Sequence, residues 1–477
     1  MRILMLATLV ASATAVAVGY GWLWWKSARL VRACLKQGIQ GISLSLFQTA
    51  AYADRWSWEL LKNVQHYEKI FYVKSGQHVR LVVLDPVTVQ HVLTLNASCY
   101  EKASFVKILE ILGNGVFSAS GNDWMNQRQL LSPTFFMREL KDNFGIIKAT
   151  VKDYLECLCT HDTAVVDVHK IFSTLAVKLI YQVAFGESLD DKSAFMVYKR
   201  FDNYLHQRKH AFCGPFFNLF GFRWKSWGSV EDETYLLRVI RELVSTRRQR
   251  SSSQCTKAKL AIDILIEDLE RCEKSGSNVV LDNSATLLLA GHETTANLVT
   301  WAVYLLGTHL NLQDEARLEV QGIKDLDMKN VSQLKVLGMI LWETLRLYPP
   351  QPLIGRRCIE DNTVNGVFVP KDMEVIIPVS AIHRSVDLWG HDSEDFKPYR
   401  FANGINKAYR VPSSFLPFGS GPRTCIGQSL ALLEAKTILY YMLKHYSWEI
   451  SPGYQHFPDV TLTLLPRFGM PILLFRL

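Results

Sequence analysis

The sequence predicts a mostly α-helical protein with a smaller β portion, and three stretches of the chain lead to this fold class. From about residue 104 up to the Pro349-Pro350 pair, long amphipathic segments follow one another, and only Pro133 and Pro215 interrupt them. After these prolines, "TVNGVFVPKDMEVIIPV" places an Asn-Gly turn between β-rich runs, which is the pattern of a hairpin. The tail "VTLTLLPRFGMPILLF" predicts further strands.

The composition is that of a large globular protein with one core. The chain has 477 residues, of which 48% are hydrophobic and 21% are charged. Its net charge of +8 is too small and too diffuse to predict a nucleic-acid partner, and it fits better a docking face for an acidic protein or a membrane surface. The nine cysteines are scattered without a CxxC pair, which argues against a disulfide framework or a zinc site and indicates a reducing compartment.

The amino terminus differs from the rest of the chain. No charged residue occurs from Ile3 to Trp25, and 23 helical residues span about 35 Å, enough for a bilayer core of about 30 Å. Basic residues follow and no acidic residue precedes Asp54, so the positive-inside rule predicts a cytosolic body. A cleaved signal peptide is the alternative. We expect an anchor at 1–25, a linker and the start of the body at 26–65, and one catalytic domain at 66–477.

Residues 57 to 100 mix short alternating runs such as "HVRLVVLD" with helical pieces. In the helical region that follows, "WMNQR" places Trp124 and Arg128 one turn apart on one face. Ordinary helix packing also explains that spacing. Arg356 and Arg423 are two more cations without an obvious acidic neighbour, and together the three arginines could bind an anionic group.

The stretch "LLLAGHETTANLV" interrupts an apolar helix with polar residues. A buried acid beside a hydroxyl is costly unless it is used or paired, so Glu293 and Thr294 are candidates for passing protons inward. The alternative for Thr294 is a bond back to the carbonyl of Ala290, which is common for helical threonine. We assign no role to His292.

The stretch "ETLRLYPP" places Glu343 and Arg346 one turn apart on a helix with apolar neighbours. A surface pair would contribute little to stability. A buried pair would need a further partner, and Arg400 in "KPYRF" is the candidate for it.

The loop "PFGSGPRTCIG" holds Cys425 among three glycines, two prolines and an arginine. Glycine backbone can direct amides toward the sulfur, and a helix is predicted to begin just after the cysteine. The loop therefore suits a sulfur that stays anionic, either as a metal ligand or as a nucleophile, whereas a plain buried cysteine would need none of these features.

In this order, the stretches resemble the cytochrome P-450 superfamily of haem-thiolate mono-oxygenases, from about residue 66 to the end and in the anchor. The pattern FxxGxRxCxG is met by Phe418, Gly421, Arg423, Cys425 and Gly427. The AGxxTT-type element is met at residues 290–295, and the ExxR pair by Glu343 and Arg346, with Arg400 as the third member.

The resemblance implies haem b as cofactor, with Cys425 as the axial ligand of its iron. It also implies that Glu293 and Thr294 serve catalysis, and that Glu343, Arg346 and Arg400 are structural. It implies an NADPH-dependent flavoprotein reductase, O2 and an apolar small molecule as partners, and no nucleic acid. The expected location is the endoplasmic reticulum membrane, with a single span and the catalytic domain in the cytosol. The residues that it assigns to cofactor binding are Trp124, Arg128, Arg356, Phe418, Arg423 and Gly427.

The chain also departs from the pattern of that family. The first proline is Pro86, so the proline-rich hinge of microsomal members is missing after the anchor, and Ser385 and Tyr399 stand where acids are commoner. The body most resembles a plant group that modifies terpenoids and isoprenoid-derived hormones. Candidate contacts to the reductase are cations expected near the cysteine face: Arg138, Lys141, Lys407 and Lys436.

Two other functions stay open at this point. One is a haem-thiolate isomerase or dehydratase that rearranges peroxides without O2. The other is a haem-binding sensor or carrier without turnover. Glu293 and Thr294 count against both, because neither function needs a proton path to bound oxygen.

Overall fold

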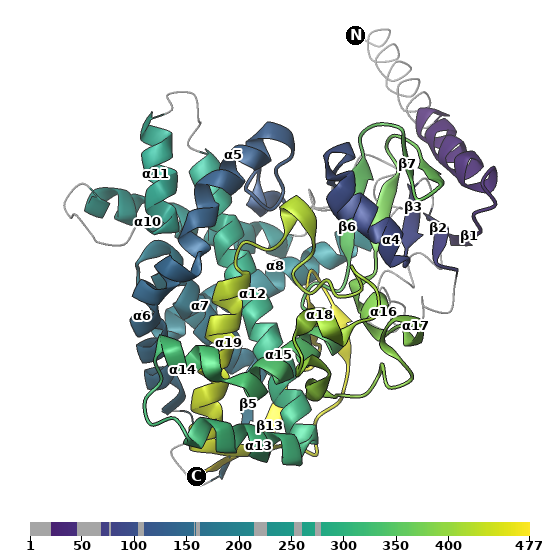
Figure 1. The fold of residues 1–477 in the computed structure, drawn as a ribbon. Coiled ribbons are helices and arrows are strands. Elements are labelled where there is room, and N and C mark those ends of the chain that lie inside the picture. The colour runs from purple at the N-terminus through teal and green to yellow at the C-terminus, as the bar shows by residue number, and fades with distance from the viewer. Residues whose placement is uncertain are drawn as a thin grey trace.

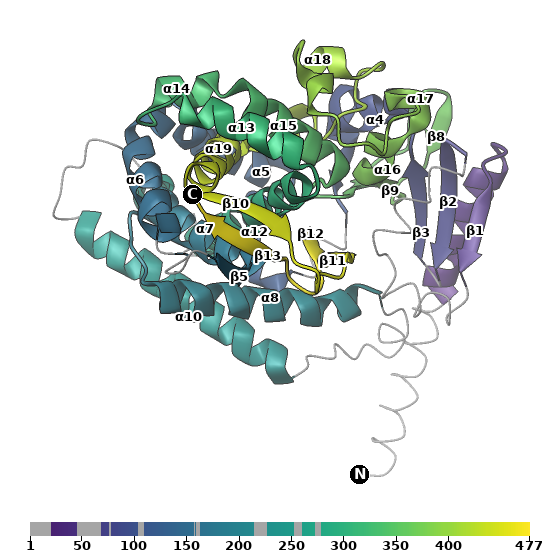
Figure 2. The same ribbon diagram turned by 90° about the horizontal axis from the view of Figure 1, so that it is seen from below.

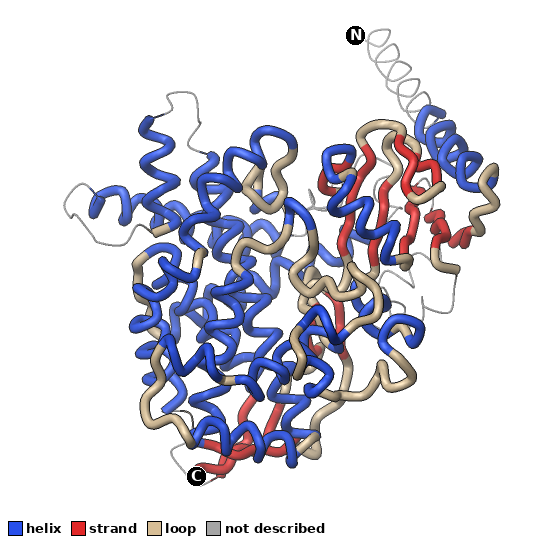
Figure 3. Tube along the Cα trace, in the orientation of Figure 1, coloured by secondary structure: helices blue, strands red, loops and turns tan. Residues whose placement is uncertain are grey.

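The computed structural model describes residues 21–44, 68–75, 78–103, 109–156, 158, 163–213, 227–251, 260–271 and 278–477. In Figure 1 the helices fill one side of the molecule, and most of the sheet lies on the other side beside the amino terminus. Figure 3 shows the same division by secondary structure. Of the predicted anchor, residues 1–20 lie outside the described part of the chain. No helix within that part is both long enough and apolar enough to cross a bilayer.

The helical side is built around one long helix, α12 (Asn278–Thr308). Most of its residues are buried, as expected for a helix that is apolar nearly all round. It packs against α7, α10, α15 and α19, and Figure 2 shows it together with α19 in the interior. The main helices around it are α5 (Gly121–Leu131), α6 (Met137–Glu156), α7 (Val168–Phe185), α8 (Asp191–Cys213), α10 (Trp227–Ser251), α11 (Ala261–Arg271), α13 (Leu310–Gln321), α15 (Lys335–Leu347) and α19 (Gln428–His445).

Short helices complete the connections between the larger elements. These are α4 (Pro86–Gln90), η2 (His91–Leu95), η3 (Ala97–Cys99), η5 (Glu110–Leu112), η6 (Ser132–Phe135), α14 (Met328–Gln333), α16 (Val379–Arg384), α17 (Val386–Trp389), η7 (Pro398–Phe401), α18 (Ile405–Ala408) and η8 (Gly421–Arg423).

The largest sheet has six strands in the order β1-β2-β3-β9-β6-β4. Its strands are β1 (Gly41–Leu44), β2 (Ile70–Ser75), β3 (His78–Val83), β4 (Tyr100–Lys102), β6 (Ile354–Cys358) and β9 (Glu374–Ile377). The predicted hairpin forms between β7 (Asn362–Val364) and β8 (Val367–Val369). Asn365 and Gly366 both have positive φ, at 50° and 79°, as a two-residue hairpin turn of this kind requires.

One short strand lies in the stretch that the sequence predicted to be overwhelmingly helical. β5 (Thr163–Asp167) pairs antiparallel with β13 (Pro471–Arg476), which also pairs with β10 (Tyr446–Ile450). The sequence analysis did not predict this strand, because a five-residue strand whose partner is more than 300 residues away leaves little local signal. The predicted tail strands are present as β11 (Pro458–Val460), β12 (Leu464–Pro466) and β13.

The segment after the expected anchor is folded onto the sheet. Residues 21–35 are helical, and β1 then pairs parallel with β2. The Gln37 side-chain amide donates to the Phe368 carbonyl at 2.9 Å and accepts from its N–H at 2.6 Å. Lys26 forms an ion pair with Asp372 at 3.2 Å. Part of the range 26–65, where we expected a linker and the start of the body, is therefore held to the sheet by specific contacts.

Candidate functional site

The cysteine loop is fixed between η8 and the start of α19. The Cys425 N–H donates to the Phe418 carbonyl at 2.9 Å, and Gly427 directly precedes the first residue of α19. Gly421 has φ +71°, and a Cβ there would lie 2.0 Å from the Leu93 carbonyl oxygen. Only glycine fits at that position, because both its conformation and the close approach of η2 exclude a side chain.

Cys425 is surrounded by protein, and its side chain is nevertheless accessible. Burial raises the pKa of its thiol, while the Gly427 amide and the Arg128 and Lys102 charges act to lower it. A metal cation bound to the sulfur would offset the cost of burial. The geometry therefore fits a sulfur that binds a metal cation inside the protein.

Four cations lie near this sulfur. In the antiparallel pair of β4 and β6, Lys102 stands directly opposite Arg356. Like charges in such positions destabilise a sheet. Burial lowers the pKa of Lys102 well below its usual range, and Arg356 and Arg423 lower it further. The pKa values of Arg356 and Arg423 also fall to about 10, chiefly through burial, and burial lowers that of Arg128.

No ion pair within the described part of the chain involves any of these four cations, although Glu101 acts on Arg423 from a distance. One nitrogen of Arg423, Nη1, is buried without a hydrogen-bond partner in that part. Its other terminal nitrogen donates to the Ala119 carbonyl at 2.8 Å, and the guanidinium lies 4.3 Å from the centre of the Trp124 ring. Lys102 lies 4.0 Å from the centre of the Phe117 ring. One buried and three partly buried cations, with an unsatisfied donor among them, fit an anionic ligand such as a pair of carboxylates.

Sequence reasoning found three of these cations and missed Lys102. The letters "YEK" carry no recognisable motif, and residue 102 lies more than 250 positions from Arg356 in the chain. Only the pairing of β4 with β6 brings the two charges together.

The polar break in α12 exposes part of an otherwise buried helix. Ala290 is exposed, and the Thr294 hydroxyl donates to the Ala290 carbonyl at 2.8 Å. The local bond that we considered as the alternative for this threonine is thus present. A Cβ on Gly291 would lie 2.5 Å from the Ile180 side chain, so glycine lets α7 approach α12 closely here.

Glu293 points toward the turn between β11 and β12. Its Oε1 accepts from the Thr463 hydroxyl at 2.6 Å, while its Oε2 is buried without a partner. Burial raises the pKa of Glu293 to about 7, and the bond from Thr463 acts in the opposite direction. Glu293 and Thr294 are adjacent on α12, but their side chains have different hydrogen-bond partners. The Thr294 hydroxyl donates to the Ala290 carbonyl, and Oε1 of Glu293 accepts from Thr463.

Glu343 and Arg346 form a bidentate ion pair within α15, with both side chains fully buried. Arg346 Nε lies 2.8 Å from Oε2 of Glu343, and its Nη2 lies 2.7 Å from Oε1. The remaining Arg346 donors reach backbone carbonyls, including those of His383 at 2.9 Å and Asp395 at 3.0 Å. A buried pair is stable only when such further bonds satisfy it, and here they do.

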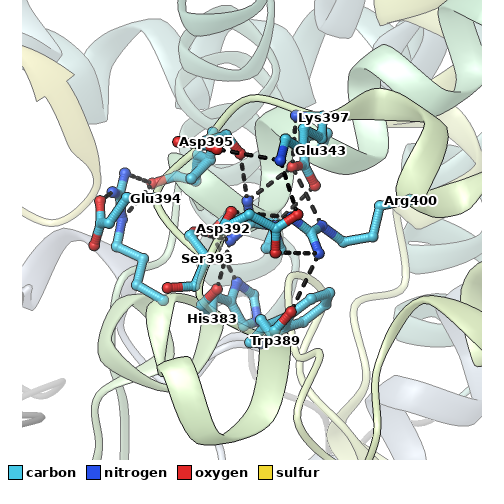
Figure 4. A network of polar contacts seen from close by, with 12 residues as sticks. Glu343, His383, Trp389, Asp392, Ser393, Glu394, Asp395, Lys397 and Arg400 are labelled. Carbon is cyan, nitrogen blue, oxygen red and sulfur yellow. Dashed lines mark hydrogen bonds and ion pairs between the residues drawn. The ribbon is translucent and has the colours of Figure 1, made fainter.

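Figure 4 shows Lys397 and Arg400 close to the Glu343 carboxylate. The Lys397 N–H donates to Glu343 at 3.0 Å, and Arg400 Nε lies 3.6 Å from the same carboxylate. Arg400 also donates to the Trp389 carbonyl at 3.2 Å and pairs with Asp392 at 3.2 Å. These contacts fasten the segment around η7 to α15.

The cations expected on the docking face differ in their surroundings. Arg138, Lys141 and Lys407 are exposed, although Arg138 pairs with its neighbour Glu139 at 2.9 Å. Lys436 is partly buried, donates to the Val331 carbonyl at 3.2 Å and has a pKa lowered by burial. Lys436 is therefore a poor candidate for contact with a partner.

Comparison with known proteins identifies a family and several relatives to which this sequence is similar. The sequence profile of the family described as Cytochrome P450 matches residues 42–473. A protein of Arabidopsis thaliana named cytochrome P450 734A1 is 32% identical over 504 aligned residues, covering 96% of this chain and 94% of the relative. A protein of Paris polyphylla named cytochrome P450 CYP72A616 is 29% identical, with coverages of 99% and 98%. An 11-oxo-beta-amyrin 30-oxidase of Medicago truncatula is 30% identical, with coverages of 87% and 82%.

Proposed function

The chain belongs to the cytochrome P450 family of haem mono-oxygenases, and we propose that it hydroxylates an apolar terpenoid-like molecule with electrons from an NADPH-dependent reductase. The observation that carries the chemistry is the accessible sulfur of Cys425 beside a group of four cations that includes the unsatisfied Nη1 of Arg423. Each further part of the proposal rests on its own residues.

We propose Cys425 as the axial ligand of the haem iron. When bound, haem supplies the activation of O2 for insertion of one oxygen atom. The propionates would be held by Arg128, Arg356 and Arg423, with Lys102 as a fourth cation and Trp124 beneath the Arg423 guanidinium. Phe418 and Gly427 would serve by fixing the loop backbone, through the carbonyl that accepts from Cys425 and the amide that faces its sulfur.

The proposed roles of Glu293 and Thr294 follow from their place on α12. A carboxyl with a pKa of about 7 can both take up and release a proton at physiological pH. The Thr294 hydroxyl, which now donates to the Ala290 carbonyl, retains lone pairs and can rotate to donate elsewhere. We propose that Thr294 orients a proton toward the reacting oxygen and that Glu293 resupplies it.

The relatives support a terpenoid-like substrate class. One of them is named as an oxidase of 11-oxo-beta-amyrin, and the other two carry cytochrome P450 names without a substrate. At about 30% identity we propose the class of substrate and not a particular molecule or carbon atom.

We propose a single-pass anchor in the endoplasmic reticulum membrane, with the body in the cytosol. The uncharged run from Ile3 to Trp25 supports this location. Trp22, Trp24 and Trp25 are each more than half exposed at its end, where indole rings suit a membrane interface. The proposed reductase would dock near the exposed cations Arg138, Lys141 and Lys407.

A reconstituted assay tests the proposed function. Membranes that contain the full chain and a plant NADPH-dependent reductase are incubated with terpenoids, steroids and adenine-type hormones. We expect at least one terpenoid to give a hydroxylated product that requires both NADPH and O2. The matched controls are membranes without reductase and membranes with the Cys425→Ala variant.

Two results would contradict the proposal. Conversion of an added peroxide without NADPH or O2, together with no product in their presence, would favour the isomerase or dehydratase reaction. Haem binding with no NADPH consumption above the reductase background would favour a sensor or carrier.

A further inference from the structure

Glu293 is the inner end of a buried polar chain that joins four residues from three parts of the fold. The Thr463 hydroxyl donates to Glu293 at 2.6 Å, and the Asn297 side-chain amide donates to the Thr463 oxygen at 2.8 Å. The carbonyl oxygen of the Asn297 side chain lies 3.1 Å from Nε2 of His169. Asn297, Thr463 and His169 are 0%, 2% and 7% exposed.

The directions of these hydrogen bonds are determined by the chemistry of the groups. The Asn297 nitrogen donates to Thr463, so its oxygen must accept, and Nε2 of His169 must carry the proton. Burial lowers the pKa of His169, which favours the neutral ring that this arrangement requires. Each link donates toward Glu293, and the chain therefore ends on one carboxyl oxygen.

The other carboxyl oxygen is left open by this arrangement. Oε2 of Glu293 is buried and has no hydrogen-bond partner within the described residues. An unsatisfied buried acceptor is costly, whereas a protonated Oε2 would be a donor beside Thr294. Holding Oε1 fixes the plane of the carboxyl group and so decides where Oε2 points.

We infer that Thr463 and Asn297, backed by His169, are positioning residues for oxygen activation, which hold Glu293 by Oε1 so that Oε2 carries the transferable proton. This inference rests on the proposed function of Glu293 and deepens it. An amide does not readily pass protons, so Asn297 positions the acid and does not form a proton wire. The turn between β11 and β12 thereby becomes part of the catalytic apparatus on α12.

Several other groups act electrostatically on this carboxyl group. They are Tyr198, Asp202 and His206, all on α8. The Asp202 charge raises the pKa of Glu293, while the Thr463 hydroxyl and His206 lower it. Removing the Thr463 hydroxyl must therefore raise the pKa of Glu293 above its present value of about 7.

The test compares three variants of the haem-loaded full chain. Thr463→Val removes the hydroxyl at nearly constant shape, and Thr463→Ser restores it. Thr461→Val is the matched control, because the Thr461 hydroxyl lies in the same turn and has no hydrogen-bond partner. The first readout is the infrared C=O band of protonated Glu293, identified by its absence in Glu293→Gln and followed as a function of pH.

We expect Thr463→Val to move the midpoint of this titration upward by about one pH unit, a tenfold change in the protonation equilibrium. Thr463→Ser and Thr461→Val should titrate like the unmodified chain. The second readout is product formed per NADPH consumed. It should fall several-fold in Thr463→Val, with the missing oxygen released as hydrogen peroxide, and stay unchanged in Thr461→Val.

An unshifted Glu293 band in a haem-loaded Thr463→Val protein would overturn the inference, and so would equal shifts in Thr463→Val and Thr461→Val. If Thr463→Val loses haem and Thr463→Ser does not, the titration is carried out on an Asn297→Ala variant. This substitution removes the hydrogen bond from Asn297 to Thr463 and should shift the band in the same direction. The infrared readout needs no substrate. A shifted band in Thr463→Val, together with an unmodified chain that forms no product from any substrate, would therefore contradict the proposed function and leave the positioning intact.

Discussion

Lys102 and Arg356 face one another across two antiparallel strands without a compensating acid in the described part of the chain. Such a pair opposes folding unless an anion binds between the charges. Removing one of the two charges should therefore stabilise the haem-free protein and weaken its binding of haem.

We predict that Lys102→Met stabilises the haem-free protein by roughly 0.2–1 kcal/mol and weakens haem retention several-fold. Denaturant unfolding of the haem-free protein and transfer of haem to an excess of apomyoglobin measure the two effects. Lys141→Met is the control, because Lys141 is exposed. Equal retention of haem in Lys102→Met and Lys141→Met would contradict a role for Lys102 in holding the cofactor.

Glu434 on α19 gives a prediction about pH. It is 2% exposed, and burial raises the pKa of its carboxyl group to about 8, although Thr295 acts to lower it. In the unfolded chain the pKa is near 4.5. The folded state therefore holds the proton more tightly, and this contribution to stability is lost as the pH rises from about 4.5 through about 8.

We expect Glu434→Gln, which stays neutral, to lose this dependence. The difference between its Tm and that of the unmodified protein should increase with pH over that window. This increase corresponds to a difference in the free energy of unfolding of a few kcal/mol at most. Calorimetry at several pH values measures the difference. A constant difference in Tm across the window would mean that Glu434 titrates in the folded protein as it does in water.

At the residue scale, the sequence predicted the groups that lie in recognisable local patterns. Cys425, Glu293 and the Glu343–Arg346 pair could be found because glycines, an apolar helix or a one-turn spacing surround them. Lys102 and Thr463 could not, because each meets its partner only through pairing of segments more than 150 residues apart.

At the scale of elements, the buried ion pair in α15 connects this helix to the segment that contains His383 and, through His383, to the loop that leads to Cys425. Arg346 donates to the His383 carbonyl, and the neutral His383 ring accepts at Nε2 from the Leu416 N–H at 2.8 Å. Burial lowers the pKa of His383 to about 3, so the ring keeps this acceptor at physiological pH. The loop that leads to Cys425 is therefore supported by α15 through one arginine and one histidine.

We predict that Glu343→Ala destabilises the protein by about 3–5 kcal/mol, since it leaves a fully buried arginine without its partner. The variant should express with little haem, measured as the ratio of haem absorbance to protein. Glu156→Ala is the control, because Glu156 pairs with Lys152 on the surface at 3.8 Å and such a pair contributes about 0–1 kcal/mol. A stable, haem-loaded Glu343→Ala protein with normal unfolding would contradict the structural role.

The sequence predicted long helices better than short strands. α12 and α19 have enough apolar residues to be recognised on their own, and the β7–β8 hairpin has its Asn365-Gly366 turn. β5 has neither length nor a turn and depends on β13 for its conformation. The sequence predicted a linker and the start of the body at 26–65 but not how this segment is held, because its contacts with Phe368 and Asp372 are specific to the folded sheet.

At the scale of the whole molecule, the helical side supplies α12 and α19, while the sheet supplies two of the four cations through β4 and β6. Mostly helical structure with a smaller sheet portion was predictable from the sequence, and the division seen in Figure 1 follows it. How the two sides meet around Cys425 was not predictable, because that meeting depends on long-range pairing. Specific contacts also join residues 26–44 to the sheet.

The central claim is that Cys425 binds the haem iron as a thiolate, and the spectrum of the reduced protein with carbon monoxide tests it most directly. We predict the strongly red-shifted Soret band of thiolate ligation in the unmodified chain, its loss in Cys425→Ala, and its retention in Cys99→Ala, which removes another described cysteine. A Cys425→Ala protein that keeps the red-shifted band would contradict the assignment.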